Sequence, residues 1–530
     1  MRSTFHSLET AKRSLFTQQT ALSTVGHNIA NANTEGYSRQ TVNMTASRPM
    51  EAVGLMSSST PGQLGTGVEF TSITRIREKF LDDQYRNENK SLGNWTIQAD
   101  TLDKLESIMN EPSETGIRTV LDNFWKAWSD LSNNPGDLTG LKIVRENAVA
   151  LADAFNYTSK KLSDLSSDLD SNISIKITET NSILSSISNL NGEIQRIEGL
   201  GNDANDLRDQ RDLLTDKLSK ILNITVQDTP QGYNILSLGG TSLVTGKAAT
   251  PLTVDSLREA FDSGTLNSGE IYGMIFSRDT FVTDYKNQLD TLANSVANGQ
   301  VKVTVPVGSV LPVGSTVTKV NADGSTTDVA ITDANKEVTD ASGMVLLVNG
   351  LNGLQKLGYT ATDTYQQGID FFTPSSGTTI SAATISLNSL IVQDPSRIAT
   401  SLRTVGSGSD TKAVKGNNTL ALITSELKNQ KFTFPLTNGS TLNGTIDDYF
   451  GSIVGQLGVQ SQEATRQMNN QNSLVSQVQS NRQSVSGVSI DEEMSSMIMY
   501  QHAYNASARF MTTMDQILDK IINSMGVVGR

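Results

Sequence analysis

The stretch LETAKRSLFTQQTALSTVGHNIANANTEGYSRQ, residues 8–40, decides which kind of fold this chain can adopt. Its apolar residues recur in alternating steps of three and four, with one polar interruption at Gln18. Such a narrow stripe is typical of a coiled-coil seam, whereas a helix on a globular core has a broader apolar face. The sequence therefore predicts an N-terminal helix that needs a partner helix along Leu8, Ala11, Leu15, Leu22, Val25, Ile29 and Ala32.

The polar cluster NIANANTEGYSRQ, residues 28–40, allows two interpretations: a ligand site, or a helix terminus that joins two parts of the structure. The rest of the chain offers no obvious companion groups for a ligand, so we favour the joint. Asn31 and Asn33 would bond carbonyls at the end of the helix, and Gly36 would permit a turn. Tyr37 and Arg39 would then anchor the chain as it leaves the helix.

The end of the chain repeats the seam pattern, and a second stripe lies on an adjacent face of the same predicted helix. A helix that is apolar on two faces needs more than one partner. Exposed apolar termini of this kind point to a polymer subunit whose ends become ordered on assembly. The seam consists of Met497, Tyr500, Tyr504, Ser507, Met511, Met514, Leu518, Ile521 and Met525, and the second stripe of Ala503, Ala506, Phe510 and Ile517.

Ser489 and Glu492 have the spacing of a capping box at the start of this C-terminal helix. The acidic run 491–493 can also be read as a metal or acid–base cluster. Acidic side chains in a first turn complement the helix dipole, however, and need no further role.

The middle of the chain indicates long helices, at about 90–133, 137–198, 204–222, 280–298 and 445–485, with β structure over 223–254. Pro112 and Pro135 are expected to interrupt the first helical tracts where turns are needed. Trp125 and Trp128, three residues apart, are expected on a buried helix face. Aspartates and basic residues alternate over 204–222, which we interpret as a solvated salt-bridge face rather than a calcium site. These aspartates are Asp206, Asp209, Asp212 and Asp216, interleaved with Arg208, Arg211 and Lys217.

Residues 301–366 differ in composition from the helical tracts, because they are rich in Val and Thr and contain a hairpin signal at Asp323-Gly324. The predicted fold class is mainly α with β: a discontinuous terminal coiled-coil module, an elongated helical-bundle domain with a β element, and a small inserted β domain. The corresponding ranges are 1–40 with 488–530, 41–300 with 367–487, and 301–366.

The composition excludes several function classes. The 530 residues carry a net charge of −13 and no cysteine, and only 36% are hydrophobic. The acidic balance argues against nucleic acid as a partner, and no apolar run is long enough for membrane insertion. The three histidines lack zinc-site spacing, and no nucleophile motif stands in a suitable context. We therefore expect no catalytic residue, no cofactor and no metal. The N-terminus also lacks the apolar core of a cleavable signal peptide.

A family resemblance rests on both ends of the chain. Residues Ala32, Asn33, Thr34, Gly36, Tyr37 and Arg39 match the N-terminal signature of flagellar rod, hook and junction proteins. With this signature, the chain resembles the flagellar hook-associated proteins, most closely the type at the first hook–filament junction. The segments that select this type are GTGVEFTSITRIREKFLDDQYR (65–86), NEPSETGIRTVLDNF (110–124), ANDLRDQRDLL (204–214), GIDFFT (368–373) and SVSGVSIDEEMSSMIMYQHAYNASAR (484–509).

The resemblance implies a structural subunit that is exported unfolded by the flagellar type III apparatus to the cell exterior. It implies a ring of copies between the hook protein and the second junction protein, and a dedicated chaperone that holds the C-terminal region before export. The residues expected at subunit interfaces are Leu8, Leu15, Leu22, Val25, Ile29, Asn33, Gly36, Tyr37, Arg39, Tyr500, Tyr504, Phe510, Met511, Met514, Leu518 and Ile521.

Two alternatives stay open at this point. A secreted enzyme or adhesin could use the β insert to bind a surface or glycan, although 301–366 contains no histidine and only scattered aspartates. Within the axial proteins, the hook protein is the second possibility. The ANDLRDQRD helix and the SGVSIDEE run weigh against the hook protein.

Overall fold

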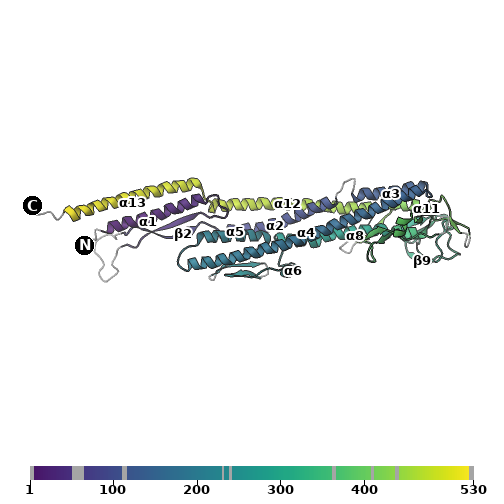
Figure 1. Ribbon diagram of the computed structural model, residues 1–530, viewed down its shortest axis with the longest axis horizontal. Coiled ribbons are helices and arrows are strands. Elements are labelled where there is room, and N and C mark those ends of the chain that lie inside the picture. Colours follow the sequence, from purple (N-terminus) through teal and green to yellow (C-terminus); the bar gives the residue numbers. More distant parts are fainter. Residues whose placement is uncertain are drawn as a thin grey trace, which may run out of the picture. The chain divides into compact units, whose positions relative to one another are not determined.

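The computed structural model describes residues 5–49, 65–109, 116–229, 232–237, 241–360, 366–406, 411–435 and 441–524 (Figure 1). Contacts divide the chain into two compact units. Unit 1 consists of Met1–Trp95, Ile173–Gly273 and Gln467–Arg530, and unit 2 of Thr96–Asn172 and Met274–Arg466. Because long helices dominate both units and the sheets are small, the predicted class, mainly α with β, is confirmed.

Unit 1 contains both terminal helices, α1 (His6–Ala30) and α13 (Ile490–Ser524), which lie side by side (Figure 1). A two-stranded antiparallel ribbon packs on α1. A four-stranded antiparallel sheet follows the helix α5. The strands and shorter helices are β1 (Gln40–Ala46), β2 (Val68–Arg75), α5 (Asn205–Ile221), β3 (Ile224–Thr229), β4 (Gly232–Ser237), β5 (Ser242–Thr245), β6 (Ala248–Ala249) and α6 (Val254–Asp262).

Four helical segments have residues in both units, and three of them are long. These are α2 (Lys79–Met109), α4 (Leu138–Glu198), α7 (Glu270–Phe276) and α12 (Ile446–Ser486). The helices predicted at 137–198, 204–222 and 445–485 are confirmed to within one residue at each end. The tract predicted at 90–133 is instead two helices, since α2 ends at Met109 and α3 (Ile117–Asn133) follows. Pro112, the predicted punctuation, lies outside the described residues.

Unit 2 is built around α3, the first half of α4, and α8 (Thr283–Asn298), which continues from a π-helical turn, η1 (Ser277–Val282). The two predicted tryptophans are confirmed as a core face, since Trp125 is 4% exposed and Trp128 is fully buried. Trp128 contacts Phe371 with ring centroids 5.6 Å apart, and Phe124 lies between Trp128 and a second buried phenylalanine, Phe372.

A six-stranded sheet in unit 2 has the order β18-β17-β7-β10-β8-β9. Four of its strands, β7 (Gln300–Val305), β8 (Thr316–Val320), β9 (Thr326–Ala330) and β10 (Met344–Asn349), fall in or next to the predicted insert 301–366. The other two, β17 (Phe432–Pro435) and β18 (Thr441–Gly444), do not. Strand β17 covers the edge of β7 at Phe432 and Val301, where an unpaired edge would be left open. The three-part division of the chain stays a prediction.

The remaining elements of unit 2 are short, and they surround the aromatic core. They are α9 (Gly350–Leu357), β11 (Tyr359–Thr360), β12 (Phe372–Pro374), β13 (Ile385–Leu387), α10 (Ser389–Gln393), η2 (Pro395–Arg397), β14 (Ala399–Ser401), β15 (Thr404–Val405), β16 (Lys412–Ala413), α11 (Thr419–Glu426) and η4 (Leu427–Asn429).

The buried side-chain amide of Asn352, on α9, connects this helix to α8 and β12. The Asn352 side chain is 5% exposed and accepts hydrogen bonds from the backbone N–H groups of Phe371 and Phe372, both at 2.8 Å. It donates to the Phe372 carbonyl at 2.9 Å and to Asn298 at 3.0 Å. Buried backbone groups left without a partner are costly, so this asparagine substitutes for strand pairing beside the core.

We expect Asn352→Leu to lower the free energy of unfolding of unit 2 by about 2–5 kcal/mol, because it leaves two buried N–H groups and a carbonyl without their hydrogen-bond partner. Asn294→Leu, an exposed asparagine on α8, is the matched control and should change stability by about 0.5 kcal/mol or less. Urea unfolding followed by tryptophan fluorescence measures both variants. Equal stability of the two variants would contradict the assignment.

Candidate functional site

The helices α1 and α13 run antiparallel, because Ser14 bonds Ser507 at 2.7 Å while Asn28 bonds Glu493 at 3.0 Å. The predicted interface residues on these two helices are buried to different degrees. Val25 and Leu518 are buried, and Phe510 and Ile521 are exposed. The half-buried ones are Leu8, Leu15, Leu22, Ile29, Tyr500, Tyr504, Met511 and Met514. Met525 lies outside the described residues.

The turn after α1 has the conformation expected of a joint. The Asn31 side chain donates to the His27 carbonyl at 3.0 Å, as predicted. Asn33 is exposed, and within the described ranges its side chain has no hydrogen bond, so the same expectation for Asn33 is wrong. Gly36 has φ of 81°, and a Cβ there would lie 3.0 Å from the Leu213 Cβ. Both constraints favour glycine.

Asn28 is the polar centre of the joint and was missed in the sequence. It is 1% exposed, and its side chain makes four hydrogen bonds to described residues, all of them in unit 1. Its Nδ2 donates to the Gln40 carbonyl at 2.9 Å and to Glu493 Oε2 at 3.0 Å. Its Oδ1 accepts from the Tyr37 hydroxyl at 2.7 Å and from the Gln40 N–H at 3.0 Å. A polar residue two positions before the end of α1 was the available signal.

Arg39 connects this turn to the start of α13. Its guanidinium donates to Glu493 Oε1 at 2.6 Å and to Glu492 Oε2 at 2.8 Å, and its N–H donates to the Ser486 carbonyl at 2.9 Å. Glu493 is only 2% exposed, so its charge requires both Arg39 and Asn28. The expectation that the acidic run needs no role beyond the helix dipole is therefore wrong.

The capping box at the start of α13 is only partly formed. The Glu492 N–H donates to the Ser489 hydroxyl at 3.5 Å, the long limit for a hydrogen bond. The Glu492 carboxylate is used on Arg39, where it completes a pair of carboxylates around one guanidinium. The joint and the helix cap thus share the same acidic residues.

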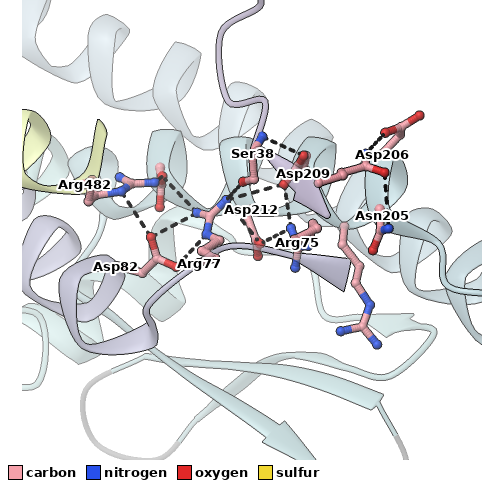
Figure 2. Close-up of polar contacts among 12 residues, drawn as sticks. Ser38, Arg75, Arg77, Asp82, Asn205, Asp206, Asp209, Asp212 and Arg482 are labelled. Carbon is pink, nitrogen blue, oxygen red and sulfur yellow. Dashed lines mark hydrogen bonds and ion pairs between the residues drawn. The ribbon is translucent and has the colours of Figure 1, made fainter. Parts of the chain in front are cut away.

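Behind the joint lies a buried charge cluster of four arginines and four aspartates, most of them shown in Figure 2. Each of these side chains is 13% exposed or less. They come from the end of β2, the segment after it, α2, α5 and α12. The residues of this charge cluster are Arg75, Arg77, Arg86 and Arg482 with Asp82, Asp209, Asp212 and Asp216.

The pairs in the charge cluster are short and shared. Arg75 contacts Asp209 at 2.6 Å and Asp212 at 3.0 Å. Arg482, from α12, bridges α2 and α5 by contacting Asp82 at 3.1 Å and Asp216 at 2.8 Å. The prediction of a solvated aspartate face on α5 is therefore wrong for three of its four aspartates. Arginines from elements distant in sequence cover this face, which the local pattern of α5 could not reveal.

The charge cluster also holds the joint. The Ser38 N–H donates to Asp209 Oδ2 at 2.9 Å, and Asp206 accepts from the Gln40 side chain at 2.7 Å (Figure 2). Burial raises the pKa of Tyr37, and nearby Asp206 raises it further. The phenol therefore keeps the proton that it donates to Asn28.

Burial alone would raise the pKa of Asp212, but the surrounding arginines, Arg77 first, outweigh it and hold this pKa below its usual value. For Asp209 the balance is opposite, since burial raises its pKa despite the contact with Arg75. The arginines around Asp212 thus favour its charged form.

Within the described ranges, no group of three or more His, Asp or Glu side chains is placed to hold a metal ion. His27 lies 3.3 Å from Asp206 and stacks edge-on against Tyr37, as part of the joint. No helix in the described part of the chain is long and apolar enough to cross a membrane.

Comparisons with protein families place both ends of the chain in one class. Residues 8–37 match the family model "Flagella basal body rod protein", and residues 479–525 match "Flagellar basal body rod FlgEFG protein C-terminal". These matches cover nearly all of α1 with the turn after it, and the whole of α13. Both terminal helices are thus similar to segments of flagellar basal body rod proteins. Between them, residues 102–300 match "Flagellar hook-associated protein FlgK helical domain".

Full-length relatives select the member of this class. Flagellar hook-associated protein 1 of Bacillus subtilis (strain 168) is 35% identical over 544 residues, covering 100% of both chains. Flagellar hook-associated protein 1 of Escherichia coli (strain K12) is 25% identical over 576 residues, covering 97% of this chain and 99% of the relative. The solved flagellar hook junction protein FlgK from Burkholderia pseudomallei has a TM-score of 0.45 and 16% identity, over 76% of this chain and 100% of that chain.

The chain belongs to the family of flagellar hook-associated protein 1, FlgK. It is a structural protein of the bacterial flagellum, of the kind found at the hook–filament junction. The resemblance stated from the sequence is confirmed.

We expect Asp212→Asn to lower the free energy of unfolding of unit 1 by about 3–5 kcal/mol, because removing one member of a buried ion pair leaves its partners uncompensated. Asp203→Asn, in the exposed turn before α5, keeps the same chemical change outside the charge cluster and should cost about 0.5 kcal/mol or less. Hydrogen exchange of the α5 amides under urea reports on unit 1 directly. A similar loss in both variants would contradict the role of Asp212.

The lowered pKa of Asp212 also predicts a pH dependence. A carboxyl whose folded pKa lies below its unfolded value, about 3.9, stabilises the fold above that pH and loses this contribution as pH falls through the folded pKa. The stability difference between the native chain and Asp212→Asn should therefore shrink below about pH 4. Urea midpoints of both proteins from pH 7 to pH 2.5 test it. A difference independent of pH would refute the prediction.

Proposed function

We propose that this protein forms the junction between flagellar hook and filament as a ring of copies, and that α1 and α13 are the parts that pack between copies. The observation that carries this proposal is an apolar surface on α13 that its partner α1 leaves uncovered. A structural role needs a surface of this kind, because neighbouring copies must bury something in common.

This surface, the α13 stripe, consists of residues that recur in steps mostly of three and four on the face next to the α1 contact. Met499 is 56% exposed, Phe510 40%, Ile517 45% and Ile521 39%. Exposed large apolar residues in one row are unusual on a free protein and mark an interaction surface. The α13 stripe is Met499, Ala503, Ala506, Phe510, Ile517 and Ile521.

The joint supports assembly because it fixes the orientation of α13 relative to α1. Arg39, Glu493 and Asn28 connect the end of α1, the following turn and the start of α13 through buried bonds. Buried charge pairs tolerate little displacement, so the orientation of α13 relative to α1 is well specified. The α13 stripe is thereby presented in a defined direction. The interface roles of Asn33, Gly36, Tyr37 and Arg39 are part of the same proposal.

Family membership supports further parts of the proposal. We infer export without a cleaved signal peptide through the type III apparatus, an extracellular position in the flagellum, and a chaperone that holds the C-terminal region before assembly. The expected neighbours are the hook protein on one side and the second junction protein on the other. The relatives are named flagellar hook-associated protein 1, and we propose no catalytic role for this chain.

Substitutions in the α13 stripe should prevent assembly without unfolding the monomer. Phe510→Ser and Ile517→Ser each remove an apolar contact worth about 1.5–3 kcal/mol, so incorporation into flagella should fall roughly tenfold or more. Asn505→Ser, an exposed polar residue on another face of α13, is the control and should incorporate normally. Immunoblots of purified flagella together with circular dichroism of the monomers measure both properties.

Normal incorporation of the two stripe variants would contradict the proposal. Leu22→Asp with Ile29→Asp tests the seam itself, since these half-buried residues lie on α1. This double variant should abolish incorporation and motility while unit 2 stays folded.

Amide exchange in the monomer should also show which helices lack part of their final packing. We expect faster amide exchange in α1 and α13 than in α4, and a slowing of that exchange on assembly, because exposed apolar faces weaken local stability. Strong protection of both terminal helices in the monomer would speak against assembly-coupled ordering.

A further inference from the structure

The pair of α1 and α13 carries a second candidate contact surface besides the α13 stripe, and this surface is a groove. This terminal groove has a volume of about 680 Å³ and is lined by residues at the start of α1 and at the end of α13. Its apolar lining includes Leu518, which is 9% exposed, and Phe5 and Ile522, which are 63% and 67% exposed. The lining that matters here is Phe5, Leu8, Asp515, Leu518, Asp519 and Ile522.

The terminal groove and the α13 stripe lie on different sides of the same helix. An α-helix turns about 100° per residue, so Ile517 of the stripe and Ile522 of the groove point roughly 140° apart. Leu518, which is buried, occupies the sector between them. The α1 contact thus separates the two surfaces, and one copy cannot fill its own groove with its own stripe.

Charges distinguish the two surfaces as well. Asp515 and Asp519 line the groove together with one basic residue, Lys520. Arg509 is exposed beside Phe510 of the stripe. In the part of the chain that the structure describes, neither Arg509 nor Asp515 has an ion-pair partner. A stripe with an unpaired cation and a groove with an unpaired carboxylate are complementary in both polarity and charge.

We propose that the C-terminal half of the α13 stripe of one copy, Phe510, Ile517 and Ile521, packs into the terminal groove of the next copy, with Arg509 facing Asp515. The occupant of the groove is therefore a second copy of this chain. Because the two surfaces differ, each copy binds its neighbour head to tail, and such contacts generate rings or open helices rather than closed pairs. This inference rests on the proposed function and specifies the contact through which it operates.

The absence of cysteine makes the contact directly testable, because every disulfide then reports an introduced pair. Two full-length chains with different tags are produced together in cells that lack the native protein. One carries Ile517→Cys in the stripe, and the other carries Ile522→Cys or Asn523→Cys in the groove. A disulfide forms only where the Cα atoms approach within about 7 Å.

After mild oxidation of purified flagella, we expect disulfide dimers that carry both tags, at least about tenfold more abundant than the same-tag disulfide dimers in flagella that contain either variant alone. Dimers between two Ile517→Cys chains would instead indicate a closed, stripe-to-stripe pair and overturn the inference. Incorporated subunits without any cross-link at these positions would overturn it too. If the tagged native chain itself failed to enter flagella, the proposed function, rather than this contact, would be at fault.

Charge reversal gives a second readout that does not depend on cysteine geometry. Arg509→Glu and Asp515→Arg should each lower incorporation several-fold, and the double variant should restore it, because each copy then offers the reversed pair to its neighbours. The two residues lie six positions apart and point about 120° apart on α13, so a pair within one helix cannot explain the rescue. A double variant no better than the single ones would count against the contact.

Discussion

The arrangement of unit 1 depends on one buried charge, that of Glu493. A carboxylate at 2% exposure is stable only when its partners are in place, and here they are Arg39 from the turn after α1 and Asn28 from α1 itself. Glu493 lies more than 450 positions after both Asn28 and Arg39 along the chain, yet it shares with them two hydrogen bonds of 3.0 Å or less. Because the charge tolerates no displacement, α13 has a defined register on α1.

The charge cluster extends this constraint into the rest of unit 1. Burying four arginines and four aspartates gains little stability by itself, since desolvation offsets most of the attraction. Its effect is to specify which segments meet: Arg482 joins α12 to α2 and α5, and Asp209 accepts the Ser38 N–H. Apolar residues of similar volume would tolerate slippage. Buried ion pairs therefore suit a subunit that must hold its terminal helices in one orientation, because they specify that orientation more strictly than apolar contacts do.

Local patterns predicted those features that depend on short spacings. The heptad steps of α1 and α13, the limits of α4 and α12, the buried Trp125–Trp128 face and the turn at Gly36 all follow from residues within about two turns of each other. The aspartates of α5 show where this reasoning fails. Their alternation with basic residues is typical of a solvent-exposed helix face. This face is buried because Arg75, Arg86 and Arg482, which lie on other elements, pair with its aspartates. Likewise, β17 joins β7 from 130 residues away.

The amino-acid sequence by itself determined the family, the terminal seams and the two-faced character of α13, because these are periodic or motif-based properties. The tertiary structure decided which face of α13 is covered, that Glu493 and Asn28 form the centre of the joint, and that the α5 aspartates are buried. The physical reason is that burial of a polar or apolar side chain is a property of its whole surroundings. Those surroundings come from segments that are distant in sequence, and their order along the chain does not show which of them will contact one another.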